Sequence, residues 1–236
     1  MGFLTAAIRI GFAALVAAAA LPALAGAPTT ELVARGNEPF WRLTVGPSGL
    51  AVTSTITPRL AFSAAKVTRK EHRGRTYFTA VSGRRTIAVT VDRRLCTDTM
   101  TGMPFPLSVS FTLDGEHITG CGGETIDALA GEWRVVKLDR RPLATKAGVT
   151  ITFDRDGHVS GASGCNRFMG PFKLDAEQLR FGMLGGTQMA CSPEKMKLEQ
   201  RFLKRLGAIT GVMPGRHGQL RLTEHGDTTI QLARIN

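Results

Sequence analysis

Hydrophobic and polar positions alternate along most of this chain in short runs bounded by glycine-rich and aspartate-rich turns. Apolar, β-branched or aromatic residues recur at nearly every second position in residues 40–45, 50–57, 75–81, 86–91 and 106–113. A second series covers residues 132–138, 148–154, 158–163, 168–174, 178–184, 219–224 and 228–234. A period of two indicates strands with one buried face, and strands at this short, regular spacing favour barrels or sandwiches over βαβ units.

The break between the two series predicts two domains. Residues 124–130, "ETIDALA", are typical of a connector. The sequence therefore predicts a mainly β protein with two small antiparallel β domains, barrel-like or sandwich, at residues 31–124 and 129–236. One tryptophan lies in each half, and we expect Trp41 and Trp133 to begin the two cores because a tryptophan side chain buries a large apolar area.

One segment, residues 192–207, has a helical period instead. Ser192 is suited to the N-cap, Pro193 to the first helical position and Gly207 to the C-terminal stop. The apolar residues expected on one side are Met196, Phe202, Leu203 and Leu206. This pattern predicts a single helix packed against the second sheet; the alternative is an exposed amphipathic helix that meets anionic lipid.

The N-terminus predicts export. Arg9 precedes an uncharged run from Ile10 to Ala25, and the run ends in the small-x-small pattern of Ala23 and Ala25. This is typical of a secretory signal peptide at residues 1–25, cleaved after Ala25. The alternative is a retained anchor, but the run is short for a bilayer span of about 20 residues. No later stretch is long and apolar enough to span a membrane, so we expect a periplasmic or secreted protein rather than a membrane-associated one.

Composition and charge fit a globular exported protein and narrow its partners. Hydrophobic residues make up 43% and charged residues 21%, which supports a real core. The formal net charge is +11, and after removal of Arg9 the parts before and after residue 128 carry +3 and +7. This excess is either solvated surface charge or an attraction to an anionic surface, such as lipopolysaccharide phosphates or cell-wall polymers. Nucleic acid is not an expected partner, because the sequence lacks a zinc finger and its basic residues are not interleaved with aromatics.

The four cysteines predict two disulfides. Their spacings, 25 and 26 residues within each half, favour the pairs Cys96–Cys121 and Cys165–Cys191. An oxidising compartment allows such bridges to persist. A reactive thiol and a metal site are the alternatives, but the sequence contains no C-x-x-C and its five histidines are scattered.

Three near-motifs fall short of a catalytic or ligand site. "GASGC" differs from G-x-S-x-G because Cys165 replaces the last glycine, so Ser163 is expected to be a turn residue. "TGCGGE" lacks the last glycine of a dinucleotide loop. "DRDGHVSG" lacks the later acid of a calcium loop, and a hairpin turn at Asp156 and Gly157 explains it better. We therefore predict no catalytic residue, no metal ligand and no cofactor.

The segment "CTDTMTGMPFP", residues 96–106, is the candidate binding loop. It is anchored by a cysteine and contains Asp98, Met100, Met103 and Phe105. One interpretation is a stapled connection whose apolar residues face inward. The other is a rigid loop that presents the two methionines and the phenylalanine to a protein or an apolar ligand, since binding function concentrates on loops.

Residues 129–234 resemble the META domain, the family of heat-shock protein HslJ. The resemblance rests on Trp133, on "GCNRFMGPF", on "TQMAC", on the following helix and on the closing hairpin "LRLTEHGDTTIQL". It implies a compact antiparallel sheet with one helix, a place in the cell envelope and a link by name to the stress response. The family supplies no established catalytic residue, so none is carried over.

Residues 35–123 resemble an uncharacterised exported bacterial domain that often precedes META domains. "GNEPFW", the C-x-D-x-M-[ST]-G pattern that starts at Cys96, and "GCGG" carry this resemblance. Two functions follow as hypotheses. The first is a non-enzymatic envelope protein, connected with stress, that binds an envelope component or a partner protein. The second is a module similar to lysozyme inhibitors, whose 96–106 loop enters the cleft of a wall hydrolase.

Overall fold

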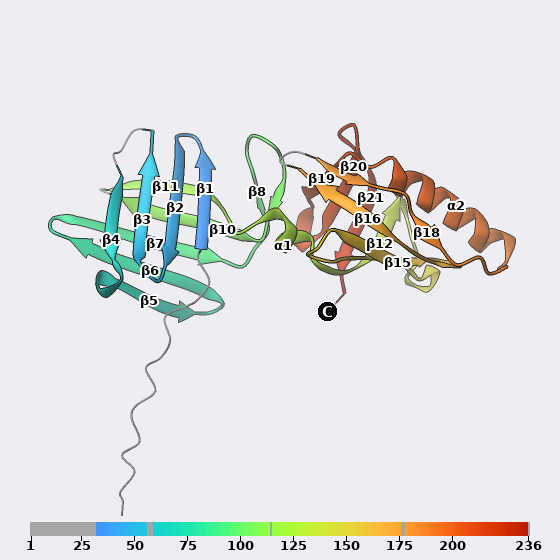
Figure 1. Cartoon of the computed structure of the whole chain (residues 1–236), viewed down its shortest axis with the longest axis horizontal. Helices are drawn as coiled ribbons and strands as arrows, with labels where there is room; N and C mark the ends of the chain where they lie inside the picture. Colours follow the sequence, from blue (N-terminus) through green and yellow to red (C-terminus); the bar gives the residue numbers. More distant parts are fainter. Residues whose placement is uncertain (1–31, 56–58, 114, 176–177, 236) are drawn as a thin grey trace, which may run out of the picture.

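The protein is described from a computed structural model, in which residues 32–55, 59–113, 115–175 and 178–235 are placed. The predicted signal peptide at residues 1–25 lies outside the described residues. The rest is mainly β, with two nearly closed antiparallel sheets and two α-helices in the described ranges (Figure 1). No helix in these ranges is long and apolar enough to cross a membrane.

The first sheet has nine strands in the order β4-β3-β2-β1-β11-β10-β7-β6-β5. Their bounds are β1 Leu32–Asn37, β2 Phe40–Gly46, β3 Gly49–Ser54, β4 Leu60–Ser63, β5 Val67–His72, β6 Arg75–Ser82, β7 Arg85–Asp92, β10 Leu107–Leu113 and β11 Glu116–Gly122. A 3-10 turn, η1 (Ala64–Lys66), joins the two ends of this order, so β4 and β5 follow each other in the chain. The sheet curls around a core in which Trp41 meets Phe111 edge to face at 4.9 Å.

The second sheet has the order β17-β16-β15-β14-β12-β21-β20-β19, with β13 beside β12 and β18 beside β16. Its strands are β12 Gly131–Leu138, β13 Arg141–Pro142, β14 Val149–Phe153, β15 His158–Ser163, β16 Arg167–Leu174, β17 Leu179–Phe181, β18 Gly185–Gly186, β19 Gly211–Pro214, β20 Leu220–Glu224 and β21 Asp227–Arg234. Two 3-10 turns, η2 (Thr145–Ala147) and η3 (Arg216–Gly218), complete this half. The hairpin predicted at Asp156 and Gly157 joins β14 to β15, and Trp133 is completely buried in the core.

The predicted helix is α2, Pro193–Gly207, with Ser192 at the N-cap position and Pro193 as the first residue. Phe202 and Leu206 are fully buried against the second sheet. Met196, predicted to lie on the packed side, is 42% exposed. Met196 lies in the first turn of α2, whereas the buried residues Phe202 and Leu206 lie in later turns.

The connector between the halves is itself a short helix, α1 (Thr125–Leu129), which is fastened to the second half. The indole nitrogen of Trp133 donates a 2.6 Å hydrogen bond to the carbonyl of Leu129. The guanidinium of Arg234 lies 4.3 Å above the Trp133 ring and donates to the carbonyls of Ala128 and Ala130. The second core therefore starts inside the segment expected to be only a connector.

Both predicted disulfides are present. Cys96 is bonded to Cys121 and Cys165 to Cys191, with Cα–Cα distances of 5.5 and 6.0 Å. The first bridge ties a two-stranded ribbon, β8 (Cys96–Thr97) and β9 (Pro104–Phe105), to strand β11. Because each bridge stays within one half, sulfur cross-links the halves separately.

The ribbon nevertheless joins the halves by packing. Met103 and Phe105, from the loop between β8 and the first sheet, belong to the core of the second half, together with Cys121. The nearest neighbour of a Cβ added at Gly102 would be the methyl group of Met213, on β19. Part of the second core is therefore supplied by residues of the first half.

Candidate functional site

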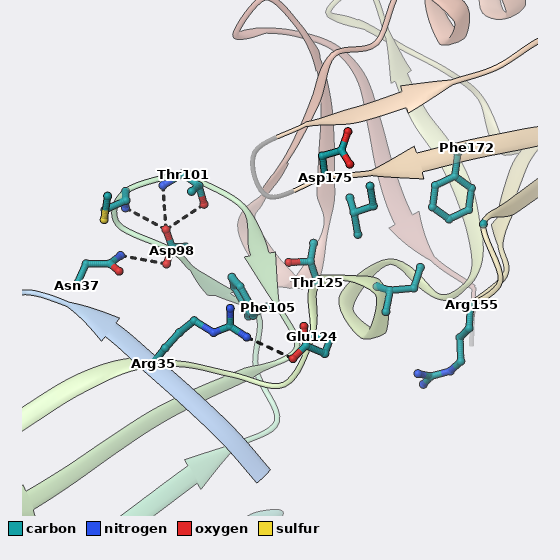
Figure 2. Close-up of a pocket in the computed structure, with 14 residues that line it drawn as sticks. Arg35, Asn37, Asp98, Thr101, Phe105, Glu124, Thr125, Arg155, Phe172 and Asp175 are labelled. Carbon is teal, nitrogen blue, oxygen red and sulfur yellow. Dashed lines mark hydrogen bonds and ion pairs between the residues drawn. The ribbon is translucent and has the colours of Figure 1, made fainter. Parts of the chain in front are cut away.

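A groove of about 580 Å³ lies where the two halves meet (Figure 2). One side of the groove is lined by strand β1, by the 96–106 loop with its strand β9, and by α1. The other side is lined by the β14–β15 turn and the end of β16. The lining residues are Arg35, Asn37, Asp98, Met100, Thr101, Phe105, Glu124, Thr125, Ile126, Arg155, Gly157, Phe172, Leu174 and Asp175. The groove thus exists only because both halves contribute to it.

Asp98 fixes the loop at one end of the groove. One carboxylate oxygen accepts hydrogen bonds from the backbone of Met100 at 3.1 Å and from the backbone and hydroxyl of Thr101 at 2.8 and 2.9 Å. The other oxygen accepts a 3.0 Å bond from the amide of Asn37, on β1. Burial alone would raise the pKa of Asp98, but these hydrogen bonds outweigh it and hold the pKa below the ordinary value. The side chain is therefore a fully engaged carboxylate that shapes the loop.

Arg35 forms the charged centre of the groove. Its guanidinium lies 5.1 Å from the centre of the Phe105 ring and donates to the Glu124 carboxylate at 3.3 Å (Figure 2). Stacking of this kind holds a cation over an aromatic face. The Nε atom of Arg35 is buried and has no hydrogen-bond partner among the described residues. The Arg35 side chain as a whole is 39% exposed, so an acceptor in the groove would meet its terminal guanidinium nitrogens rather than this buried atom.

The apolar surface of the groove comes from α1 and β16 and has a charged margin. Ile126, Phe172 and Leu174 supply the apolar surface. Arg155 forms an ion pair with Asp127, which ties the β14–β15 turn to α1. The groove as a whole is more polar than a usual small-molecule site, since eight of its fourteen lining residues are polar or charged.

The candidate binding loop is divided by this arrangement. Met103 and Phe105 are buried, at 2% and 7% exposed, while Met100 is 66% exposed at the tip. Asp98, Met100 and Phe105 line the groove, whereas Met103 lines a neighbouring hollow beside Val212 and Met213. That the loop binds a partner stays a prediction, and the side chain available for direct contact is Met100.

The "GCNRF" stretch around Cys165 forms a separate polar cluster. Glu199, on α2, accepts hydrogen bonds from the Ser163 hydroxyl, from the Asn166 backbone at 2.9 Å and from the Asn166 amide at 3.0 Å. The side-chain amide oxygen of Asn166, Oδ1, accepts hydrogen bonds from the Thr187 hydroxyl at 2.8 Å and from the Met189 backbone N–H at 2.7 Å. Burial would raise the pKa of Glu199, but these bonds lower it below the ordinary value. Since the polar groups satisfy one another, the cluster fastens α2 and the segment before it to the sheet.

Eleven of the fourteen lining residues, among them Arg35, Glu124, Ile126 and Phe172, were not predicted as site residues. Arg35 and Phe105 are 70 positions apart in the sequence, and no local pattern connects them. Glu124 follows directly after "GCGG" and is the first residue of the predicted connector, and Phe172 ends the motif "GCNRFMGPF". No group of three or more His, Cys, Asp or Glu side chains in the described ranges could hold a metal ion.

Residues 127–235 match the family model of the META domain. The second half of the chain is a META domain. The "GCNRF" cluster described above lies within this META domain. The naming after HslJ and the resemblance of residues 35–123 to an exported domain remain predictions.

Two solved structures are similar to the chain. An NMR structure of a protein from Burkholderia xenovorans is 31% identical, covers 47% of this chain and 86% of that one, and has a TM-score of 0.39. A second NMR structure is 23% identical, covers 44% and 88%, and has a TM-score of 0.35. No curated protein matches the chain. These likenesses assign no ligand to the META domain.

Proposed function

We propose that this chain is a non-enzymatic protein of the cell envelope, exported by a cleaved signal peptide, that binds an envelope component or a partner protein in the groove between its halves. The observation that carries the proposal is the groove itself, built jointly by the 96–106 loop, α1 and the META domain. Binding is favoured over catalysis because Asp98 is held by four hydrogen bonds and Arg35 is paired with Glu124.

The chemistry of the groove suits a ligand with an apolar part and a hydrogen-bond acceptor. The apolar part would lie against Ile126 and Leu174, and the acceptor would face the partly exposed guanidinium of Arg35. A segment of a partner protein has both features. The stress connection follows from the resemblance to HslJ and would mean that this binding matters when envelope proteins are damaged.

Site-specific photo-crosslinking in the envelope tests the proposal. A photoreactive amino acid replaces Met100 or Thr125, both of which line the groove, or Thr53, which is exposed on β3 of the first sheet. We expect the two groove positions to capture the same species and position 53 to capture none of it.

A steric variant provides the matched control. Thr125→Trp should fill the groove and abolish the crosslink from position 100, whereas Thr53→Trp should leave it unchanged. Equal capture from positions 53, 100 and 125, or capture that survives Thr125→Trp, would show that the groove is not the binding site.

The lysozyme-inhibitor alternative retains one supporting observation, the exposed Met100 at the tip of a loop held by a disulfide and by Asp98. The buried Met103 and Phe105 cannot enter a hydrolase cleft without leaving the second core. An inhibition assay with purified protein and its Met100→Ala variant decides this alternative. The alternative is excluded if lysozyme is as active with wild type as it is with the variant and with no added protein.

A further inference from the structure

The charge of the first half is concentrated in one stretch of the chain. Residues 59–94 carry ten Lys and Arg and two acidic side chains, a formal net charge of +8. The other residues between 26 and 128 carry two Arg and seven acidic side chains, a net charge of −5. The modest total for this half therefore conceals a strong separation of charge.

These residues also lie together in space. They form β4, η1, β5, β6 and β7, and β5, β6 and β7 are adjacent strands at the end of the sheet order. In Figure 1 these strands lie on the left and lower side of the first sheet, while the META domain is on the right. We call their exposed cations the cationic strip, which consists of Lys66, Arg69, Lys70, Arg73, Arg75, Arg84, Arg85, Arg93 and Arg94.

Local acids neutralise only part of the cationic strip. Glu71 pairs with Arg69, and Asp92 lies 3.3 Å from Arg75 and 3.9 Å from Arg94. Five members form no ion pair within the described ranges: Lys66, Lys70, Arg73, Arg84 and Arg93. Like charges held close together repel, and an anionic partner would remove that repulsion.

The shape of the cationic strip suits a broad partner rather than a small ion. Strand β6 has eight residues and is about 26 Å long. Arg84 lies at the turn that follows one end of β6, and Arg73 and Arg93 lie near the other end, where Arg75 pairs with Asp92. The cations are therefore spread along the strands, and none of them lines the groove or the neighbouring hollow beside Val212 and Met213.

Strand β5 presents this charge to solvent most openly. It is the last strand of the sheet order, and all its residues after Val67 are exposed, on both faces of the strand. A free strand edge could also accept an added strand from another protein, but Lys and Arg on an edge discourage such pairing. The occupant favoured by these observations is a wide anionic surface.

From this distribution we propose that the cationic strip docks the protein onto an anionic lipid surface. The proposal does not depend on the groove, which is built from other residues. Each basic residue close to an anionic membrane strengthens attachment by roughly fivefold. The predicted export to the envelope would bring the cationic strip within reach of lipid phosphates.

Vesicle co-sedimentation tests the proposal. Purified protein is mixed with phosphatidylcholine vesicles that contain or lack phosphatidylglycerol, at low and high salt. We expect binding only to the anionic vesicles, and loss of that binding at high salt because salt screens exposed charges. Changing Lys66, Lys70, Arg73 and Arg93 to Gln should weaken binding by about tenfold or more.

A control variant with the same net charge separates placement from total charge. It changes Lys146, Lys173, Lys195 and Lys197 to Gln, and all four are exposed on the META domain. Its affinity for anionic vesicles should stay within about twofold of wild type, because these residues are outside the cationic strip. Equal losses in the two variants, or a larger loss in the control, would overturn the proposal, and the second result would favour helix α2 as the lipid contact.

Binding of wild type to soluble polyglutamate but not to anionic vesicles would overturn the proposal in favour of an acidic protein partner. Thr125→Trp should bind vesicles normally, so failure of the groove proposal can be told apart from failure of this one.

Discussion

At the scale of single residues, two acidic side chains organise the structure by accepting hydrogen bonds. Asp98 shapes the 96–106 loop, and Glu199 joins α2 to Ser163 and Asn166. Glu199 accepts a hydrogen bond from the Ser163 hydroxyl, but Ser163 is completely buried and exposes no surface to a substrate. The polar residues of "GASGCN" are therefore explained by the attachment of helix α2. In the sequence alone, the same residues resemble a catalytic turn.

Replacing Glu199 by Gln should change how stability depends on acidity. The folded-state pKa of Glu199 lies below its ordinary value of 4.5, so the unfolded chain takes up a proton first as the pH falls. Its contribution to the free energy of unfolding is therefore complete well above pH 4.5 and is lost as the pH falls through the folded-state pKa. Urea unfolding across this range should give a flatter profile for Glu199→Gln than for wild type. The same substitution at exposed Glu132 is the control, and a Glu199→Gln profile parallel to that of wild type would contradict the assignment.

At the scale of elements, the sequence predicts the strands with clear alternation and misses β1, β4, β5, β11 and β19. The predicted runs at 86–91, 158–163 and 228–234 match β7, β15 and β21 within a residue or two. Strand β5, "VTRKEH", was missed because it is an edge strand with little to bury, so its side chains carry no apolar period. The cationic strip was missed for a different reason. The net charge was summed over the whole first half, so the basic residues of β5 were cancelled by acidic residues elsewhere in that half.

The two disulfides act at this scale, and the second can be tested alone. Closing a loop of 26 residues should stabilise the folded chain by about 3.5 kcal/mol on the chain-entropy model. Changing both Cys165 and Cys191 to Ala should lower the free energy of unfolding by roughly this amount, measured by urea denaturation under oxidising conditions. The control is the same comparison under reducing conditions, in which every bridge is open in both proteins and their stabilities should differ little. A variant as stable as the oxidised wild type would mean that Asn166 and Glu199 hold the helix without the bridge.

At the scale of the whole molecule, the halves are linked by packing that no sequence period reveals. The sequence predicts two β domains, and the structure shows two sheets with two cores. The second core, however, includes Met103 and Phe105 from the first half. The groove arises from the same junction, so its residues could not be assembled from either half alone. Contacts between positions this far apart follow from tertiary packing, which local patterns do not encode.

Met103→Ala should therefore destabilise the META domain from a position outside it. Met103 is 2% exposed within the second core, and truncating a buried methionine to alanine costs about 2–5 kcal/mol. In a Trp41→Phe background, the fluorescence of Trp133 reports unfolding of the second core alone, because the sequence has only two tryptophans. We expect the Trp133 transition to move to lower urea in Met103→Ala and to stay within about 0.5 kcal/mol in Met100→Ala, since the exposed Met100 has little to lose. If both variants leave the Trp133 transition in place, the META domain is stable without the loop, and the groove would then lie between two halves that fold independently.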